Sequence, residues 1–116
     1  MSNIPKSLSV FSLNEWLNST KENPIIIDVR ENVEIDLSSL PFVDLYIPIS
    51  KVSIEHVSQA IKSVSNREIV ILCHRGIRSY NFAQWMLENN LVKDVWNLEE
   101  GIDGWSIHID SNIPRY

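Results

Sequence analysis

The only cysteine of the chain lies in a short basic loop, Cys73-His74-Arg75-Gly76-Ile77-Arg78-Ser79. An apolar run, 69–72, precedes this loop, and a helix-like segment follows it. The two arginines and the positive end of the following helix favour a thiolate over a thiol. Gly76 permits a tight turn in which backbone N–H groups point inward and cradle an anion. The residue types and their spacing therefore predict a nucleophilic cysteine.

The alternative interpretation of Cys73 is a small buried hydrophobe at the end of a strand. Arg75 and Arg78 favour the first interpretation. They stand out because the chain as a whole has a net charge of −5. The same negative charge argues against a nucleic acid or an anionic membrane as partner.

Length and composition indicate a single domain, residues 1–116, with 44% hydrophobic residues. One cysteine cannot form an internal disulfide, which fits a reducing compartment. No apolar run approaches the roughly 18–20 residues of a membrane span, and residues 1–12 lack a secretory signal. We therefore expect a cytoplasmic location and no membrane contact. We expect neither a metal nor a cofactor, since His56 and His108 are isolated in the sequence.

Apolar runs alternate with amphipathic segments along the chain. Strands are predicted over residues 8–10, 25–29, 43–47, 68–72 and 95–98, and helices after the caps Ser12 and Ser53, over residues 79–89 and after Gly101. Residues 33–40 are left open, with one or two helical turns. This alternation indicates an α/β domain with a parallel sheet. Ligands bind at the carboxyl ends of such strands, so Cys73 and the Asp28-Arg30 pair are expected to share one site.

Four segments in chain order carry a family resemblance. They are the Cys-x-x-Gly-x-Arg-Ser loop at 73–79, Ile27-Asp28-Val29-Arg30-Glu31, the run from Trp96 to Trp105, and the tail 110–116 with Ile113-Pro114-Arg115-Tyr116. Taken together they resemble the signatures of the rhodanese family of sulfurtransferases. The resemblance implies a three-layer α/β/α domain around a central five-stranded parallel sheet. It also implies that the loop residues 74–79 bind the substrate.

Loop length separates this family from its neighbours on the same fold. Cysteine phosphatases have five residues between the cysteine and the arginine, whereas four separate Cys73 from Arg78. The shorter ring of N–H groups suits the outer sulfur of a persulfide better than a tetrahedral phosphate. A phosphatase or an arsenate reductase is therefore the less favoured alternative.

The resemblance implies a two-step sulfur relay. Cys73 takes the sulfane sulfur of a small anionic donor such as thiosulfate, and its persulfide passes that sulfur to cyanide or to a thiol, including a protein thiol. Arg78 is expected to order the loop and stabilise anionic charge, or to pair with a strand-end carboxylate. His74 and Arg75 are expected at the entrance. Ser79 is expected at the helix N-cap, within reach of the sulfur.

Asp28 and Arg30 are expected to form a structural clasp near the site rather than to contact the substrate. Two departures from the family pattern are visible. Residues 36–43 lack the histidine and the two glycines usual before the third strand, and Glu100 stands where a glycine is usual. Glu100 would be strained if its position required a positive φ angle. A second hypothesis is a rhodanese-like binding or regulatory module without turnover; the complete Cys73 loop favours the enzyme.

Overall fold

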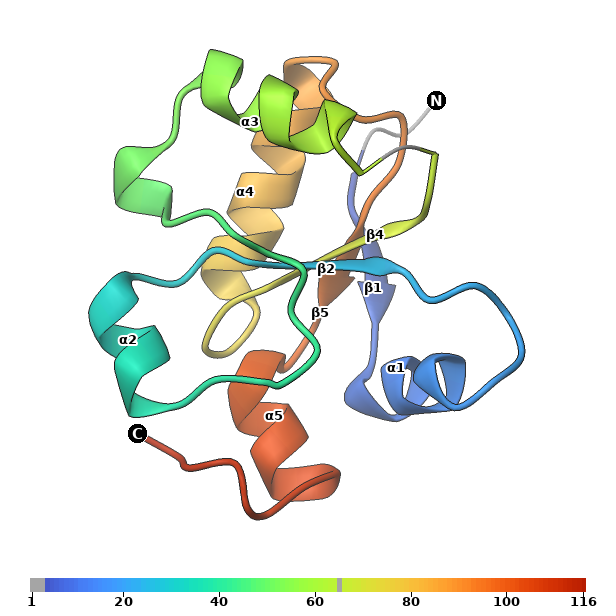
Figure 1. Ribbon diagram of the computed structural model, residues 1–116, viewed down its shortest axis with the longest axis vertical. Helices are drawn as coiled ribbons and strands as arrows, with labels where there is room; N and C mark the ends of the chain where they lie inside the picture. Colours follow the sequence, from blue (N-terminus) through green and yellow to red (C-terminus); the bar gives the residue numbers. More distant parts are fainter. Residues whose placement is uncertain (1–3, 65) are drawn as a thin grey trace.

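The computed structural model describes residues 4–64 and 66–116, in which strands and helices alternate (Figure 1). The strands are β1 (Lys6–Leu8), β2 (Ile25–Asp28), β3 (Leu45–Tyr46), β4 (Ile69–Leu72) and β5 (Trp96–Leu98). The helices are α1 (Val10–Leu17), α2 (Asn32–Leu37), α3 (Ile54–Lys62), α4 (Ile77–Glu88) and α5 (Gly101–His108), and a 3-10 turn spans Ile49–Lys51. No helix within these residues is long and apolar enough to cross a membrane.

The strands of the described chain form one parallel sheet of five strands in the order β1-β5-β4-β2-β3. β4 lies at its centre, between β5 and β2. In register, Asp28 of β2 pairs with Leu72 of β4, and Ile71 of β4 pairs with Asn97 of β5. Cys73 follows Leu72 directly, so the carboxyl ends of three neighbouring strands meet around the thiol.

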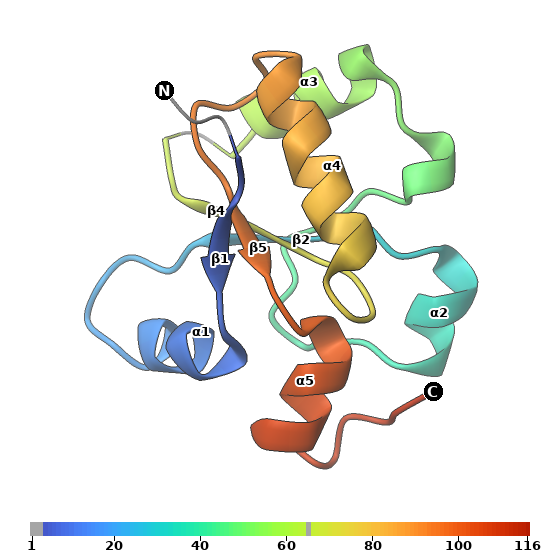
Figure 2. The same cartoon turned by 180° about the vertical axis from the view of Figure 1, so that it is seen from behind.

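Two separate cores, one on each face of the sheet, hold the helices in place. Alternate side chains of a strand point to opposite faces, and both faces of β2 and β4 are buried. The first core joins β2 and β4 to α3 and α4 and includes Ile27, Ile71, Val57, Phe82 and Met86. The second joins these strands to α1 and α5 and includes Ile26, Val70, Leu13, Ile102 and Trp105. Figures 1 and 2 show the two helix pairs on opposite sides of the sheet, which confirms the predicted α/β/α architecture.

The first strand and helix begin earlier than the sequence predicts. Ser9, not Ser12, caps α1, because the Ser9 Oγ accepts the backbone N–H of Ser12 at 3.0 Å. This cap ends β1 at Leu8 and shifts the strand toward the N-terminus of the chain. Ser53 caps α3 as predicted, accepting the backbone N–H of His56 at 3.1 Å.

A short helix, α2, fills part of the segment that the sequence left open. It begins with a capping box in which Glu31 and Glu34 each accept a backbone N–H of the other residue. This box fixes Glu34 in the first turn of α2, with its Oε1 3.2 Å from the backbone nitrogen of Glu31. Figure 2 shows α2 beside the start of α4 and close to the C-terminus. α2 therefore brings a carboxylate to the carboxyl edge of the sheet.

Candidate active site

Cys73 lies at the end of β4 and is buried, with 1% of its surface exposed. Its Sγ accepts the backbone N–H of Gly76 at 3.2 Å and that of Ser79 at 3.3 Å. The hydroxyl of Ser79 lies 3.2 Å from the same sulfur. Hydrogen bonds of this kind stabilise negative charge on a thiol sulfur, and they are arranged before any substrate binds.

Gly76 starts helix α4 and shapes the loop. Its φ of +94° is left-handed, and a Cβ at this position would collide with the backbone of Glu99. The chain therefore turns into the helix at Ile77, and Gly76 occupies the cap position. The prediction that Ser79 is the N-cap is wrong for this reason. Ser79 instead lies in the first turn, where its side chain is buried and faces the sulfur.

Asn97 of β5 connects the loop to the neighbouring strand. Its Oδ1 accepts the hydroxyl proton of Ser79 at 2.6 Å, and its Nδ2 donates to the carbonyl of Gly76 at 3.1 Å. Asn97 is 5% exposed, so both hydrogen bonds are protected from water. Together they fix the residue that turns the loop and the hydroxyl that contacts the sulfur.

Arg78 pairs with Glu34 of α2. Its Nη1 and Nη2 lie 2.6 Å and 2.8 Å from Glu34 Oε1 and Oε2, a two-pronged ion pair. The hydrogen bonds from Arg78 lower the pKa of Glu34 to about 2, and the same contact raises the pKa of Arg78. The carboxylate that pairs with Arg78 thus comes from helix α2 and not from a strand end, where the sequence predicts it.

Asp28 and Arg30 form a fully buried ion pair beside the loop. Arg30 Nη2 lies 2.8 Å from Asp28 Oδ2, and both side chains have no exposed surface. Arg30 also donates to the carbonyl of Ser38 at 2.8 Å and to the hydroxyl of Tyr116 at 2.9 Å. The pair therefore ties the end of β2 to the segment after α2 and to the tail.

The loop residues His74 and Arg75 differ in their surroundings. The His74 ring stacks on Tyr116, with ring centroids 4.1 Å apart and planes at 11°. Burial, and next the charge of Arg75, lower the pKa of His74. The Arg75 side chain is 67% exposed and its Nε lies 3.9 Å from Asp103 Oδ2. The Arg78 side chain is 40% exposed, so Arg75 is the more accessible of the two loop arginines for an incoming anion. Ile77, between them in the loop, is also exposed.

The start of α5 packs directly on the backbone of the loop. The N–H groups of Ile102 and Asp103 donate to the carbonyls of Cys73 and His74, both at 3.0 Å. Gly101 has a φ of +60°, and a Cβ there would collide with the same two carbonyls. Glu100 has a φ of −104° and needs no glycine. The positive φ lies one residue later than position 100, so the departure at Glu100 causes no backbone strain.

Three residues of the site were not predicted from the sequence. Glu34 lay in the segment left open, and Tyr116 reaches the site from the far end of the chain. Asn97 lies in the segment from Trp96 to Trp105, and a polar residue inside an apolar strand is the signal that marks it. All three act through hydrogen bonds to the loop or to the clasp.

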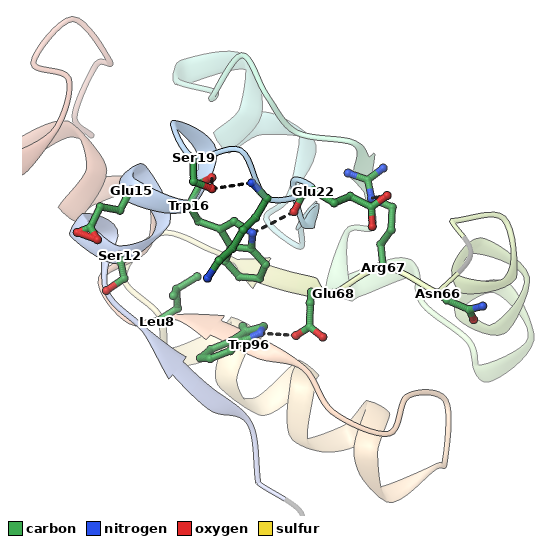
Figure 3. A pocket seen from close by; sticks show the side chains of 11 residues that line it. Leu8, Ser12, Glu15, Trp16, Ser19, Glu22, Asn66, Arg67, Glu68 and Trp96 are labelled. Carbon is green, nitrogen blue, oxygen red and sulfur yellow. Dashed lines mark hydrogen bonds and ion pairs between the residues drawn. The ribbon is translucent and has the colours of Figure 1, made fainter.

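A hollow of about 680 Å³ lies elsewhere, near the amino ends of β4 and β5, and includes none of these residues. Figure 3 shows Trp16 and Trp96 among the side chains that line it, and Trp96 Nε1 donates to Glu68 at 2.8 Å. Within residues 4–64 and 66–116, no group of three or more His, Cys, Asp or Glu side chains could hold a metal ion.

Comparisons with known proteins agree with the fold. Residues 12–108 match the family model described as Rhodanese-like domain. The chain is 32% identical over 108 residues to rhodanese-like/PpiC domain-containing protein 12, chloroplastic, of Arabidopsis thaliana, covering 88% of this chain and 36% of that protein. It is 27% identical over 113 residues to adenylyltransferase and sulfurtransferase UBA4 of Debaryomyces hansenii, covering 94% of this chain and 25% of that protein. A crystal structure of a protein from Staphylococcus saprophyticus matches with a TM-score of 0.70 and 27% identity, covering 95% of this chain and 99% of that one.

The chain thus spans about a third and a quarter of the lengths of these two curated relatives, and nearly all of the structural neighbour. The matched region contains the Cys73 loop, the Asp28-Arg30 pair, Glu34 and Asn97, whereas Tyr116 lies beyond it. Because the family model matches residues 12–108, most of the chain, this chain belongs to the rhodanese-like domain family.

Proposed function

We propose that this chain is a sulfurtransferase that carries a sulfane sulfur as a persulfide on Cys73. The observation that supports it most is the position of the Cys73 sulfur, which accepts two backbone N–H groups at 3.2 Å and 3.3 Å. Membership of the rhodanese-like family and the likeness to a protein named as a sulfurtransferase agree with the proposal. The Cys73 loop is complete, which favours turnover over a purely binding or regulatory module.

The proposed reaction has two steps and needs no oxidant or reductant. The Cys73 thiolate attacks the outer sulfur of a donor such as thiosulfate. A bond forms between Sγ and that sulfur, the S–S bond of the donor breaks, and sulfite leaves with the electron pair. A thiolate or cyanide then attacks the outer sulfur of the persulfide. The Sγ–S bond breaks and the Cys73 thiolate is restored.

Other residues of the site support these steps. The N–H groups of Gly76 and Ser79 hold charge on the sulfur, and exposed Arg75 meets the anionic donor. The acceptor is a small thiophile or a thiol, including one on a protein. We propose the cytoplasm as the location, because Cys73 has to be a free thiol between turnovers and thiols stay reduced there.

Turnover with thiosulfate and cyanide tests the proposal. We expect thiocyanate and sulfite in equal amounts, with ping-pong kinetics, and no product from Cys73→Ser. Hydrolysis of a generic aryl phosphate is measured in parallel. Phosphate release that depends on Cys73, without sulfur transfer, would establish the phosphatase alternative instead. Absence of both reactions, with thiosulfate and with other sulfane donors, would establish the binding module.

A further inference from the structure

The charge of the loop is largely neutralised before a donor arrives. Arg78, the arginine at the end of the loop, uses both Nη atoms on Glu34. We propose that Glu34 sets the donor class, so that the site selects sulfane donors with one negative charge or none over doubly charged ones. This inference rests on the sulfurtransferase function proposed above and narrows its substrate.

Glu34 is held too firmly to swing away from Arg78. Its carboxylate accepts four hydrogen bonds, two from Arg78, one from the Tyr116 hydroxyl at 2.8 Å and one from the Glu31 backbone at 3.2 Å. The Tyr116 hydroxyl is fixed in turn by the buried guanidinium of Arg30. An oxyanion that needed the Nη atoms of Arg78 would therefore have to displace a carboxylate anchored from α2 and from the tail.

The charges around the entrance leave room for one negative charge on the donor. Glu34 keeps its charge at every practical assay pH, since its pKa is about 2. Arg75 is exposed and its nearest carboxylate, Asp103, is engaged more closely by Arg115, at 2.8 Å. A first negative charge on a donor can be met by Arg75. A second negative charge finds no free guanidinium, because both Nη atoms of Arg78 are engaged by Glu34.

Two donors of nearly equal shape separate this charge effect from chemical reactivity. Thiosulfate is a dianion, and methanethiosulfonate is a monoanion in which a methyl group replaces one oxygen. Cys73 attacks the outer sulfur of either donor. A bond to Sγ forms, the donor S–S bond breaks, and sulfite or methanesulfinate leaves with the electron pair. The difference in intrinsic reactivity cancels when the ratio of the two rate constants is compared between variants.

The experiment measures persulfide formation on Cys73 by intact-mass spectrometry at low salt, with each donor in excess. We expect Glu34→Gln to raise the thiosulfate-to-methanethiosulfonate rate ratio by about threefold to tenfold, because one unit charge within ~10 Å acts with about that strength. Asp36→Asn is the matched control. It removes the same charge from the same helix at an exposed position. Its ratio is expected to stay within about twofold of the unchanged chain, since solvent and counterions screen an exposed carboxylate.

Salt gives a second test, in which each variant is compared with itself at two ionic strengths. Raising the ionic strength is expected to reduce the effect of Glu34→Gln on the rate ratio, because salt screens the charge of Arg78 that this variant leaves unpaired. An effect of Glu34→Gln that does not shrink with salt, or an equal ratio in Glu34→Gln and the unchanged chain, would overturn the inference while leaving sulfur transfer intact. Failure of Cys73 to load from either donor would instead overturn the proposed function itself.

Discussion

Ser79 donates its hydroxyl proton to Asn97 Oδ1 at 2.6 Å, while the same hydroxyl oxygen lies 3.2 Å from the sulfur of Cys73. The hydroxyl of Ser79 therefore lies between the sulfur of Cys73 and the amide oxygen of Asn97. Asn97 also donates to the carbonyl of Gly76. A strand adjacent to β4 thus fixes both the turn of the loop and the hydroxyl beside the sulfur.

Replacing Asn97 with alanine should therefore destabilise the protein. The change leaves the buried hydroxyl of Ser79 and the carbonyl of Gly76 without this partner, and we expect a loss of about 2–4 kcal/mol in the free energy of unfolding. Urea unfolding followed by tryptophan fluorescence measures it. Asn81→Ala, at an exposed position of α4, is the control and should stay within about 0.5 kcal/mol of the unchanged chain. Equal losses for the two variants would contradict the role given to Asn97.

The buried Asp28-Arg30 pair should contribute far more to stability than an exposed pair. Arg30→Met leaves the Asp28 carboxylate buried and uncompensated, and we expect a loss of about 3–5 kcal/mol. Arg115→Met breaks the pair with Asp103, in which the arginine side chain is 57% exposed. That loss should be much smaller, because solvent screens an exposed ion pair. Chemical denaturation of both variants gives the comparison, and similar losses would show that Arg30 is not a structural clasp.

Stability should fall in acid through Glu34. The folded-state pKa of Glu34 is about 2, below its ordinary 4.5, so its stabilisation is fully present above about pH 4.5 and is lost as the pH falls toward 2. We expect this carboxylate to account for about 1–2 kcal/mol of the loss, after allowance for solvent screening of the half-exposed Arg78. Unfolding free energies at pH 7 and pH 3 should show a smaller acid loss in Glu34→Gln than in Asp36→Asn. Identical acid losses would contradict the ion pair.

Backbone conformation predicts different outcomes at Gly76 and Glu100. Gly76→Ala places a Cβ against the carbonyl of Glu99 at a left-handed φ, so we expect a loss of more than about 2 kcal/mol and strongly impaired sulfur loading. Glu100 has a φ of −104°, which residues other than glycine adopt without strain. Glu100→Gly therefore relieves no strain and only adds backbone flexibility. That variant should lose no more than about 1 kcal/mol and retain loading. Thermal unfolding and mass spectrometry test both, and a stabilising Glu100→Gly would contradict the observed backbone.

The local pattern was enough to predict most of the sheet and the position of the thiol. The apolar runs at 25–29 and 68–72 are buried strands, and Cys73 follows the central one. Helix starts were harder, because several serines compete as caps. Ser53 was predicted correctly, whereas Ser12 and Ser79 were not, since Ser9 and Gly76 begin those helices.

The partners of the loop could not be predicted from local pattern, because they come from distant parts of the chain. Glu34 meets Arg78 across 44 positions, and Tyr116 meets Arg30 across 86. Only the folded sheet brings α2 and the tail to the same edge as β4. Because Glu34 pairs with Arg78, the loop carries less net positive charge than its own residues indicate. The inference about donor charge depends on this pairing.

The mass of the intact protein after incubation with a sulfane donor tests the Cys73 persulfide directly. We predict that the chain gains one sulfur atom, that cyanide removes it, and that Cys73→Ser never acquires it. No gain from thiosulfate, methanethiosulfonate or any other sulfane donor, in a folded protein with a free Cys73 thiol, would contradict it.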